Sequence, residues 1–411
     1  MITPEINKGK LAEQKTKSFL KKTFFEDFIF DNPKVREGRY EREICDLLIL
    51  FDDALVVVQC RTKSFPKSGN INTYIRKTTL DCIRQLKFSK SILFSNHRIF
   101  LSNNRRGSFE FDKNNIKRVF YLVVLEQDIM PIVSAREAKD INPKIFDYGF
   151  TPQIFDLNDF MYVVNEFDTP TDFFEYLEQR EKITKDMKFN MTDESELVAY
   201  YRIHERHFKP IPDQEKADMV TLIGFWEEYK KGKYANQVAE RVGADRISYY
   251  IDDIIEKTHT SKDQLYIKVA TILGRLRRLE RRMLAKAAIG KAIKAAKTNK
   301  PAYRMFIFPH RPEIAFLFLY TPEEKNKRRE RLFTLTACTR KIARVKEALG
   351  IASEPINHKM VSFDFCIYSE PKDYKVDDFE NKTIELCKKL FRSEKMFGQE
   401  KEYPTSPKEF K

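Results

Sequence analysis

The sequence predicts a multi-domain α/β protein with an α/β domain at the N-terminus, a helical middle and a small C-terminal α/β domain. Three observations support this fold class. Short apolar runs alternate with amphipathic stretches over residues 8–130, residues 190–300 have a mainly helical pattern, and strand-like runs return after Pro301. The chain has 411 residues, 42% of them hydrophobic, which is enough for more than one core.

The elements of the first domain, residues 1–135, follow from their periodicity. Residues 8–23 place apolar side chains among lysines, as an amphipathic helix does, and a second helix is expected from about Tyr74 to Lys90. Strands are expected where apolar residues run or alternate over four to eight positions. These stretches are FFEDFIF (24–30), ICDLLILF (44–51), ALVVVQCR (54–61), HRIFLSNN (97–104) and VFYLVVLE (119–126).

Four further segments complete the expected organisation. Residues 136–210 are expected to be a connecting helical module, in which Asp168 or Thr169 caps a helix that begins at Pro170. A helical domain with a basic helix follows over 211–300, then a C-terminal α/β domain over 301–395 and a polar tail over 396–411. Within the C-terminal domain we expect a hairpin over 304–321, a helix over 323–349, a strand over 361–369 and a helix over 379–391.

Composition excludes several classes of function. No run of about 18 to 20 apolar residues is present, and the N-terminal residues are charged where a signal peptide is apolar, so we expect a cytoplasmic protein with no membrane partner. The six cysteines have no CxxC spacing, which argues against structural zinc and against a disulfide framework. Neither GxxxxGK[ST] nor GxGxxG occurs, so ATP-driven action is not expected.

Charge is distributed unevenly along the chain. Residues 261–350 contain 23 Lys and Arg against 7 Asp and Glu, whereas residues 131–260 contain 17 against 26. The densest segment, 274–297, has nine basic residues and one Glu, and Arg275, Arg278, Arg282 and Lys286 recur at helical spacing. This pattern predicts a helix that binds a nucleic-acid backbone, with a solvent-exposed face or an acidic protein partner as the alternative.

Polar residues gather at the open end of the expected hairpin over 44–63. With Asp52 and Asp53 as a two-residue turn, Asp46 lies opposite Gln59 on the same face of the sheet. The period of two places Arg61 and Lys63 on that face as well. We therefore expect one carboxylate, one amide and two cations to converge, although a solvent-exposed end of a sheet would tolerate the same residues.

Glu13 on the first helix, Asp46 opening a strand and Gln59-Cys60-Arg61 ending the next resemble the PD-(D/E)xK restriction-endonuclease-like superfamily. The closest branches are the Mrr-like and nuclease-related (NERD-like) bacterial domains, in which QxK commonly replaces ExK. The resemblance covers roughly residues 8–130 and implies a restriction-endonuclease-like fold for the first domain. Arg61 stands where the family has Lys.

The resemblance implies a Mg²⁺- or Mn²⁺-dependent site. Asp46, the Gln59 amide oxygen and the Cys60 backbone carbonyl would be metal ligands, and Glu13 would complete or orient the site. The guanidinium of Arg61 keeps its proton, so it can stabilise charge while Lys63 takes over any proton transfer. On the helix over 74–90, Gln85 with Arg84 and Lys87 would contact nucleic acid, unless they form an ordinary amphipathic face.

The function implied is a metal-dependent endonuclease that hydrolyses phosphodiester bonds, with DNA as the expected substrate and RNA as a further possibility. Residues 151–182 also resemble uncharacterised bacterial nuclease-like proteins found near defence genes, which implies anti-phage defence. One alternative is a catalytically degenerate protein that binds nucleic acid or a partner without cleaving it. A second is an RNA-cleaving toxin or effector. The sequence leaves open a homo-oligomer or a partner protein.

Overall fold

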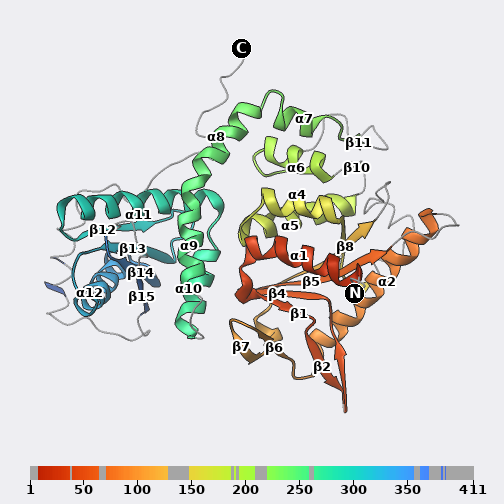
Figure 1. Cartoon of the computed structure of the whole chain (residues 1–411), viewed down its shortest axis with the longest axis horizontal. Coiled ribbons are helices and arrows are strands. Elements are labelled where there is room, and N and C mark those ends of the chain that lie inside the picture. The colour runs from red at the N-terminus through yellow and green to blue at the C-terminus, as the bar shows by residue number, and fades with distance from the viewer. Residues whose placement is uncertain are drawn as a thin grey trace, which may run out of the picture. The chain divides into compact units, whose positions relative to one another are not determined.

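The computed structural model of the chain describes residues 8–37, 39–63, 71–127, 148–186, 189–190, 194–208, 220–258, 263–355, 362–369, 381–382 and 385. The chain divides into two compact units, Met1–Val238 and Ala239–Lys411 (Figure 1). Both units combine helices with sheets, as an α/β protein does. The division falls inside α8 (Ala235–Asp245) and thus within the expected helical domain over 211–300, so it differs from the five segments expected from the sequence.

The first unit is built on a five-stranded mixed sheet with the strand order β1-β4-β5-β8-β9. The first three strands are antiparallel neighbours, whereas β5, β8 and β9 run parallel. Their bounds are β1 Ile29–Asp31, β4 Leu47–Phe51, β5 Ala54–Lys63, β8 Arg118–Gln127 and β9 Pro152–Asp156. The central strands are almost wholly apolar because helices cover both faces of the sheet.

Helices α1 (Lys8–Phe24) and α2 (Ile71–Leu93) lie on opposite faces of this sheet. Successive side chains of a strand point to opposite faces. On β5, the Cys60 thiol contacts Thr16 of α1, and the neighbouring Arg61 contacts Gln85 of α2. The open ends of β4 and β5 therefore lie between the two helices.

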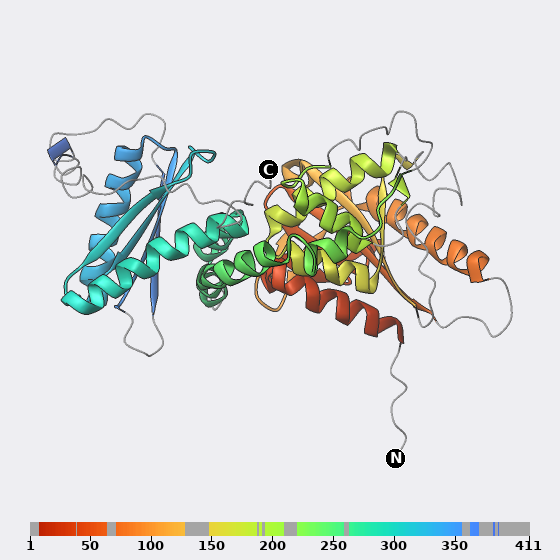
Figure 2. The same cartoon turned by 90° about the horizontal axis from the view of Figure 1, so that it is seen from above.

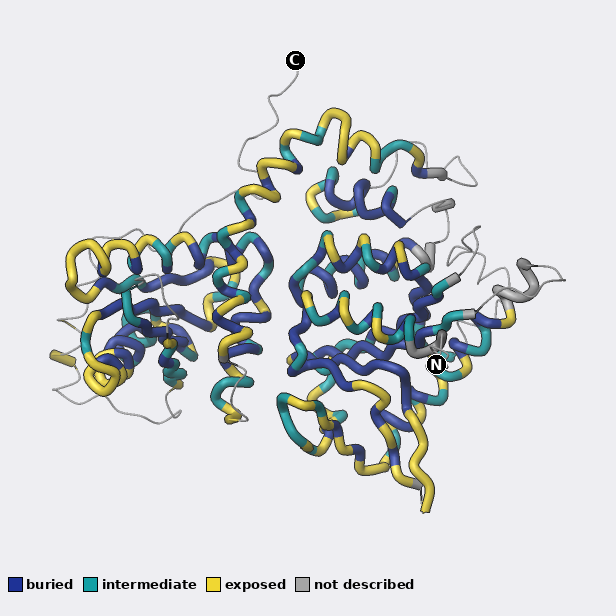
Figure 3. Tube along the Cα trace, viewed as in Figure 1, coloured by how far each residue is buried: buried dark blue, intermediate teal, exposed yellow. Residues whose placement is uncertain are grey.

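Two small antiparallel hairpins accompany this sheet, β2 (Lys34–Glu37) with β3 (Tyr40–Glu43) and β6 (Phe100–Asn103) with β7 (Gly107–Glu110). The β2–β3 hairpin comes directly before the polar end of β4, and all four residues of β3 are exposed (Figure 3). The expected strand over 24–30 is in part a 3₁₀ turn, Glu26–Phe28, followed by β1.

The expected connecting module over 136–210 is instead part of the first unit. Its β9 is an edge strand of the main sheet, and the buried Arg180 of α5 (Pro170–Asp186) donates hydrogen bonds to Glu194 and to the carbonyl of Ile154. As expected, Thr169 caps α5, since its hydroxyl accepts from the N–H of Asp172. The other elements are α4 Leu157–Glu166, β10 Phe189–Asn190, α6 Glu194–Ile203, β11 Val220–Thr221 and α7 Phe225–Lys230.

The second unit contains a four-stranded sheet in the order β12-β13-β14-β15. The strands are β12 Ala302–Ile307, β13 Ile314–Tyr320, β14 Glu347–Ser353 and β15 Phe363–Ser369. Helix α12 (Lys325–Ala343) connects the parallel strands β13 and β14. It packs on the sheet face that carries Leu317 and Leu319, while α11 (Arg278–Thr298) lies on the other face (Figure 2). Helices α9 (Tyr249–Thr258) and α10 (Gln264–Gly274) precede α11.

The C-terminal unit confirms the expected hairpin and the strand over 361–369, but the helix expected over 323–349 is too long. It ends at Ala343, where Arg344 adopts a positive φ of 57°, and residues Glu347–Ser353 form β14. Gly350 of β14 lies directly under α12, where a Cβ atom would overlap Thr336.

The helix expected over 379–391 lies almost wholly outside the described residues, as does the tail over 396–411. Across the ranges that the structure describes, no helix has the length and apolarity that a membrane span requires.

Candidate active site

The β4–β5 hairpin has the register expected from its sequence. Leu48 pairs with Val57 and Phe51 with Ala54, around a two-residue turn at Asp52 and Asp53. Asp52 takes a positive φ of 59°, a conformation that Asp tolerates better than most residues. The last paired residues are Leu47 and Val58, so Asp46 and Gln59 follow at the open end, where both are buried.

The backbone of β5 fixes the Asp46 carboxylate. The N–H of Cys60 donates a 2.6 Å hydrogen bond to Asp46 Oδ2, beyond Val58, where the pairing of β5 with β4 ends. In an extended strand the N–H and the C=O of one residue leave on the same side. The Cys60 carbonyl therefore leaves β5 on the side of Asp46.

A cavity of about 510 Å³ opens at this end of the hairpin and is lined by residues from both flanking helices. Its polar lining includes five of the expected site residues, which the structure thus brings together: Glu13 from α1, Asp46, Gln59 and Arg61 from the hairpin, and Gln85 from α2. The rest of the lining is Asn32, Arg42, Glu43, Ile44, Cys45 and Phe88. The cavity is therefore predominantly polar and contains three carboxyl groups.

Sequence reasoning missed the contribution of β3 to this cavity. Arg42 stacks its guanidinium 3.6 Å from the centre of the Phe88 ring of α2, and the next residue, Glu43, faces Asp46. The only sequence feature that pointed to Glu43 was its position three residues before Asp46. Its approach depends on the fold of the β2–β3 hairpin, which periodicity alone does not predict.

Burial and neighbouring charges alter the acidity of Asp46. Burial raises the pKa of its carboxyl group from the ordinary value of 3.8 to about 7, and the negative charges of Glu13 and Glu43 act in the same direction. The hydrogen bond from the Cys60 N–H opposes them, because it favours the carboxylate. Asp46 is therefore an acid that a nearby cation would convert to its charged form near neutral pH.

Arg61 is held in the cavity by α2. Its Nη2 donates a 2.9 Å hydrogen bond to Oε1 of Gln85. Both residues line the cavity, and the side chain of Arg61 is partly exposed. This contact orients a fixed positive charge opposite the carboxyl groups.

Three other expected site residues, Arg84, Lys87 and Lys63, are not among the described residues that line the cavity. Arg84 is exposed and pairs with Asp81 of its own helix at 2.9 Å. The Lys87 ammonium lies 4.4 Å from the centre of the Tyr148 ring. Neither residue lines the cavity. Lys63 ends β5, but its side chain lies outside the described residues.

The donor atoms at this site are of the kinds that a hard divalent cation prefers. Asp46 and Glu13 offer carboxylate oxygens, Gln59 an amide oxygen and Cys60 a main-chain carbonyl, all of which suit Mg²⁺ or Mn²⁺. Within the described ranges, no group of three or more His, Cys, Asp or Glu residues converges to hold a metal. The expected set has only two carboxylates and relies on the amide and the carbonyl for its other donors.

The expected nucleic-acid surface at the start of α11 is wrong for two of its residues. Arg278 and Arg282 are 6% and 1% exposed, and they pair with Asp252 and Asp245 at 2.6 and 3.2 Å. Arg281 is also buried and shares Asp252. These arginines join α11 to α8 and α9, so they present no face to a polyanion. Arg275 and Lys286 are exposed.

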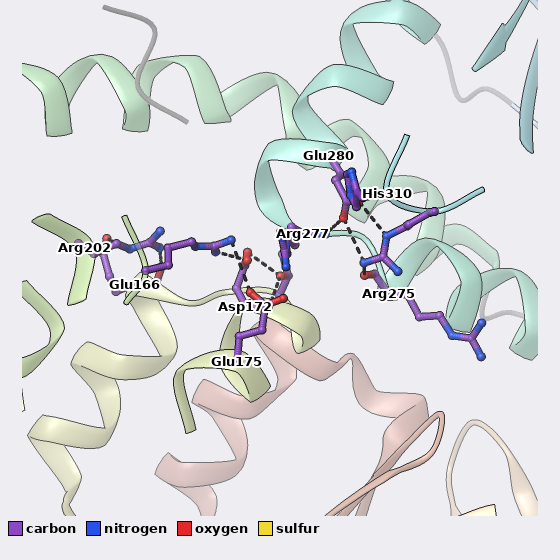
Figure 4. Close-up of polar contacts among 11 residues, drawn as sticks. Glu166, Asp172, Glu175, Arg202, Arg275, Arg277, Glu280 and His310 are labelled. Atoms are coloured by element: carbon purple, nitrogen blue, oxygen red, sulfur yellow. Dashed lines mark hydrogen bonds and ion pairs between the residues drawn. The ribbon is translucent and has the colours of Figure 1, made fainter. Parts of the chain in front are cut away.

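Glu280, the one acid of this segment, also has an internal role. Its carboxylate accepts from the backbone N–H of Arg277 at 2.6 Å and contacts His310 and Arg311 (Figure 4). In the first unit, Arg202 and Glu166 form a comparable buried pair at 3.0 Å (Figure 4). The charged residues at the start of α11 therefore stabilise the fold.

Comparisons of the chain with models of protein families, with curated proteins and with solved structures find no match. Any functional assignment therefore depends on the residues of the cavity and on their chemistry.

Proposed function

We propose that the first unit is a metal-dependent nuclease that hydrolyses phosphodiester bonds, with DNA as its substrate and the cytoplasm as its place of action. The observation that carries the proposal is the cavity at the end of the β4–β5 hairpin. It combines a buried aspartate, two further carboxyl groups, a buried amide and an arginine. Burial and neighbouring acids disfavour the charged form of the Asp46 carboxyl group and so raise its pKa. A carboxyl group with a pKa raised in this way is typical of a functional site.

Each residue has a distinct part in the proposed reaction. Asp46, Gln59, the Cys60 carbonyl and Glu13 would hold Mg²⁺ or Mn²⁺. When bound, such an ion lowers the pKa of a coordinated water and offsets charge on the leaving oxygen. Asp46 would hold such an ion as a carboxylate, because ligating carboxylates are deprotonated.

Arg61 would bind the phosphate that is cleaved. Its guanidinium offers several donors in one plane, which suits two phosphate oxygens, and Gln85 fixes its orientation. A fixed cation at this position stabilises the charge that develops in the transition state. The proposed part of Arg61 is therefore to bind and stabilise charge, not to transfer a proton.

The same residue favours one rival function. A lysine can exchange a proton at accessible pH and an arginine cannot, so Arg61 also suits a protein that retains the nuclease cavity but only binds nucleic acid. The two functions differ in turnover, and the same assay distinguishes them.

Incubation of the full chain with supercoiled plasmid and Mn²⁺ tests the proposal. We expect nicking that EDTA abolishes and that Asp46→Asn reduces by about 100-fold or more, since the substitution removes a charged ligand. Asp81→Asn on the exposed face of α2 is the matched control and should cleave normally.

Cleavage that persists in Asp46→Asn would reject this site. Retained DNA binding without cleavage in Mg²⁺ or Mn²⁺ would favour the binding-only function, and activity gained by Arg61→Lys would identify a degenerate enzyme. A labelled RNA in the same assay tests the choice of DNA as substrate.

A further inference from the structure

Helix α11 has two halves of different character. Its first half carries the arginines that pair with Asp245 and Asp252. From Met283 to Lys300 the chain contains five lysines and no Asp or Glu. These residues are Lys286, Lys291, Lys294, Lys297 and Lys300.

The second half of α11 packs through alanines. Ala288, Ala292 and Ala295 are fully buried and lie on one side of the helix, the side that packs on the sheet of the second unit. At 100° per residue, Lys286 and Lys297 lie on the opposite side, and Lys294 lies beside them. All three are exposed, and Lys286 and Lys297 lie 11 residues apart, roughly 16 Å along the helix axis.

The exposed Ile293 also lies on this side of the helix, within about 20° of Lys286 at 100° per residue. Gly290 lies between Lys286 and Lys294 on the same face, and a Cβ atom added there would meet no atom within 4 Å. Nothing in the described part of the chain therefore packs on this position. A partner could therefore approach the helix backbone closely at Gly290.

We propose that the lysine face, defined as Lys286, Lys294 and Lys297 of α11, binds the phosphate backbone of DNA independently of sequence. Lysines without interspersed acids give a local positive field, and each phosphate contact releases condensed counterions. The choice of DNA as the polyanion rests on the proposed function. The lysine face would retain DNA through the second unit while the cavity of the first unit supplies the chemistry.

Two other partners fit this face less well. A helix that binds a membrane surface needs a wide apolar face, but the apolar side of α11 is buried and only Ile293 is an exposed large apolar residue on this half. The centres of protein interfaces are depleted in lysine and enriched in aromatic residues and arginine. The lysine face has neither of the enriched types.

The test measures binding of a labelled 20-base-pair duplex to the full chain in EDTA, over a range of salt concentrations. The variant is Lys286→Ala, Lys294→Ala and Lys297→Ala combined. We expect its affinity to fall by roughly tenfold or more, and the slope of log K against log salt to fall by about 2 to 3, close to 0.9 per phosphate contact. The matched control combines Lys325→Ala, Lys327→Ala and Arg331→Ala on α12, where acids are interspersed, and should retain most of the slope.

An unchanged slope in the α11 variant, or an equal fall in the control, would overturn the inference. So would wild-type protein that does not bind the duplex. If vesicles containing phosphatidylserine bind the wild type more tightly than the duplex does, the partner is a membrane and the inference is wrong. The assay contains no divalent metal, so its outcome is independent of cleavage. If the plasmid is never cut in the nuclease assay, the proposed nuclease function is rejected, but the proposal that the lysine face binds DNA is not.

Discussion

The arginines at the start of α11 and the aspartate at the open end of the β4–β5 hairpin are both buried ionisable groups, and they differ in what surrounds them. Arg278, Arg281 and Arg282 each face an aspartate within 3.2 Å. Asp46 faces two further carboxyl groups, and burial with these charges raises its pKa to about 7. The arginines contribute to the fold, whereas Asp46 costs stability at neutral pH. A group that a fold retains at such a cost is a candidate for function.

The cluster of Asp252 with Arg278 and Arg281 gives the largest expected effect on stability. Asp252→Asn removes the negative charge that faces two buried cations, Arg278 and Arg281. We expect a loss of about 3 to 5 kcal/mol in the free energy of unfolding of the second unit. Urea unfolding measures the loss, and hydrogen exchange in α9 and α11 locates it. Asp253→Asn, an exposed neighbour, should change stability by less than about 0.5 kcal/mol. A loss below about 1 kcal/mol in Asp252→Asn would contradict the structural role.

Replacement of Asp46, which faces other carboxyl groups, should raise the stability of the first unit. The pKa of Asp46 in the folded protein, about 7, lies above its ordinary value of 3.8, so the folded state binds more protons between these values and loses stability as pH rises through this window. Asp46→Asn has no charge to bury. In EDTA at pH 8 we expect it to stabilise the first unit by roughly 1 to 3 kcal/mol, with the gain disappearing towards pH 4.

Thermal and urea unfolding at pH 4, 6 and 8 test this expectation. Asp81→Asn, whose carboxyl group is exposed and paired with Arg84, is the control. Destabilisation by Asp46→Asn at pH 8 would mean that Asp46 is a structural anchor like Asp252.

The contact between Arg61 and Gln85 should affect activity more than stability. Gln85→Ala removes the acceptor that orients the guanidinium, and we expect cleavage to slow by roughly tenfold, about 1.4 kcal/mol of transition-state stabilisation. Gln85→Glu keeps an acceptor and should retain most of the rate. Gln14→Ala, an exposed glutamine of α1, is the control. Equal rates in Gln85→Ala and wild type would remove Gln85 from the site.

Gly290 gives the smallest expected effect. The chain leaves room for a Cβ atom at this exposed position, and glycine weakens a helix interior, so Gly290→Ala should stabilise the second unit by about 0.5 to 1 kcal/mol. The buried Gly350→Ala is the contrast, because its methyl group would overlap Thr336 and should destabilise the same unit. Destabilisation by Gly290→Ala would show that a segment outside the described residues packs on the lysine face.

The sequence was sufficient to predict the hairpin and its register, because apolar runs flank a two-residue turn and pairing then follows from counting. It predicted that Glu13, Asp46, Gln59, Arg61 and Gln85 matter together, and they line one cavity. Glu43 and Arg42 could not be placed in this way, because the path of the β2–β3 hairpin depends on tertiary contacts such as Arg42 on Phe88.

For the basic helix α11, the sequence was not sufficient to predict which residues are exposed. Helical spacing grouped Arg278 and Arg282 on one face, but spacing does not say whether that face meets solvent or an acid. Asp245 ends α8 and Asp252 lies in α9, so their meeting with the arginines depends on how these helices pack against α11. Strand β9 was missed because its sequence, PQIFD, begins with a proline and has no run or alternation of apolar residues. It belongs to the main sheet through pairing with β8, which a local pattern does not reveal.

Direct binding of Mn²⁺ is the measurement that tests the central claim, that the cavity beside Asp46 is a divalent-metal site. Isothermal titration calorimetry in buffers of different ionisation enthalpy reports both the affinity and the protons released. We expect wild type to bind Mn²⁺ with release of a substantial fraction of one proton at pH 6.5 and less at pH 8.5, and Asp46→Asn to lose this binding. If wild type binds no Mn²⁺, or if Asp46→Asn binds it equally well with the same proton release, the account is wrong.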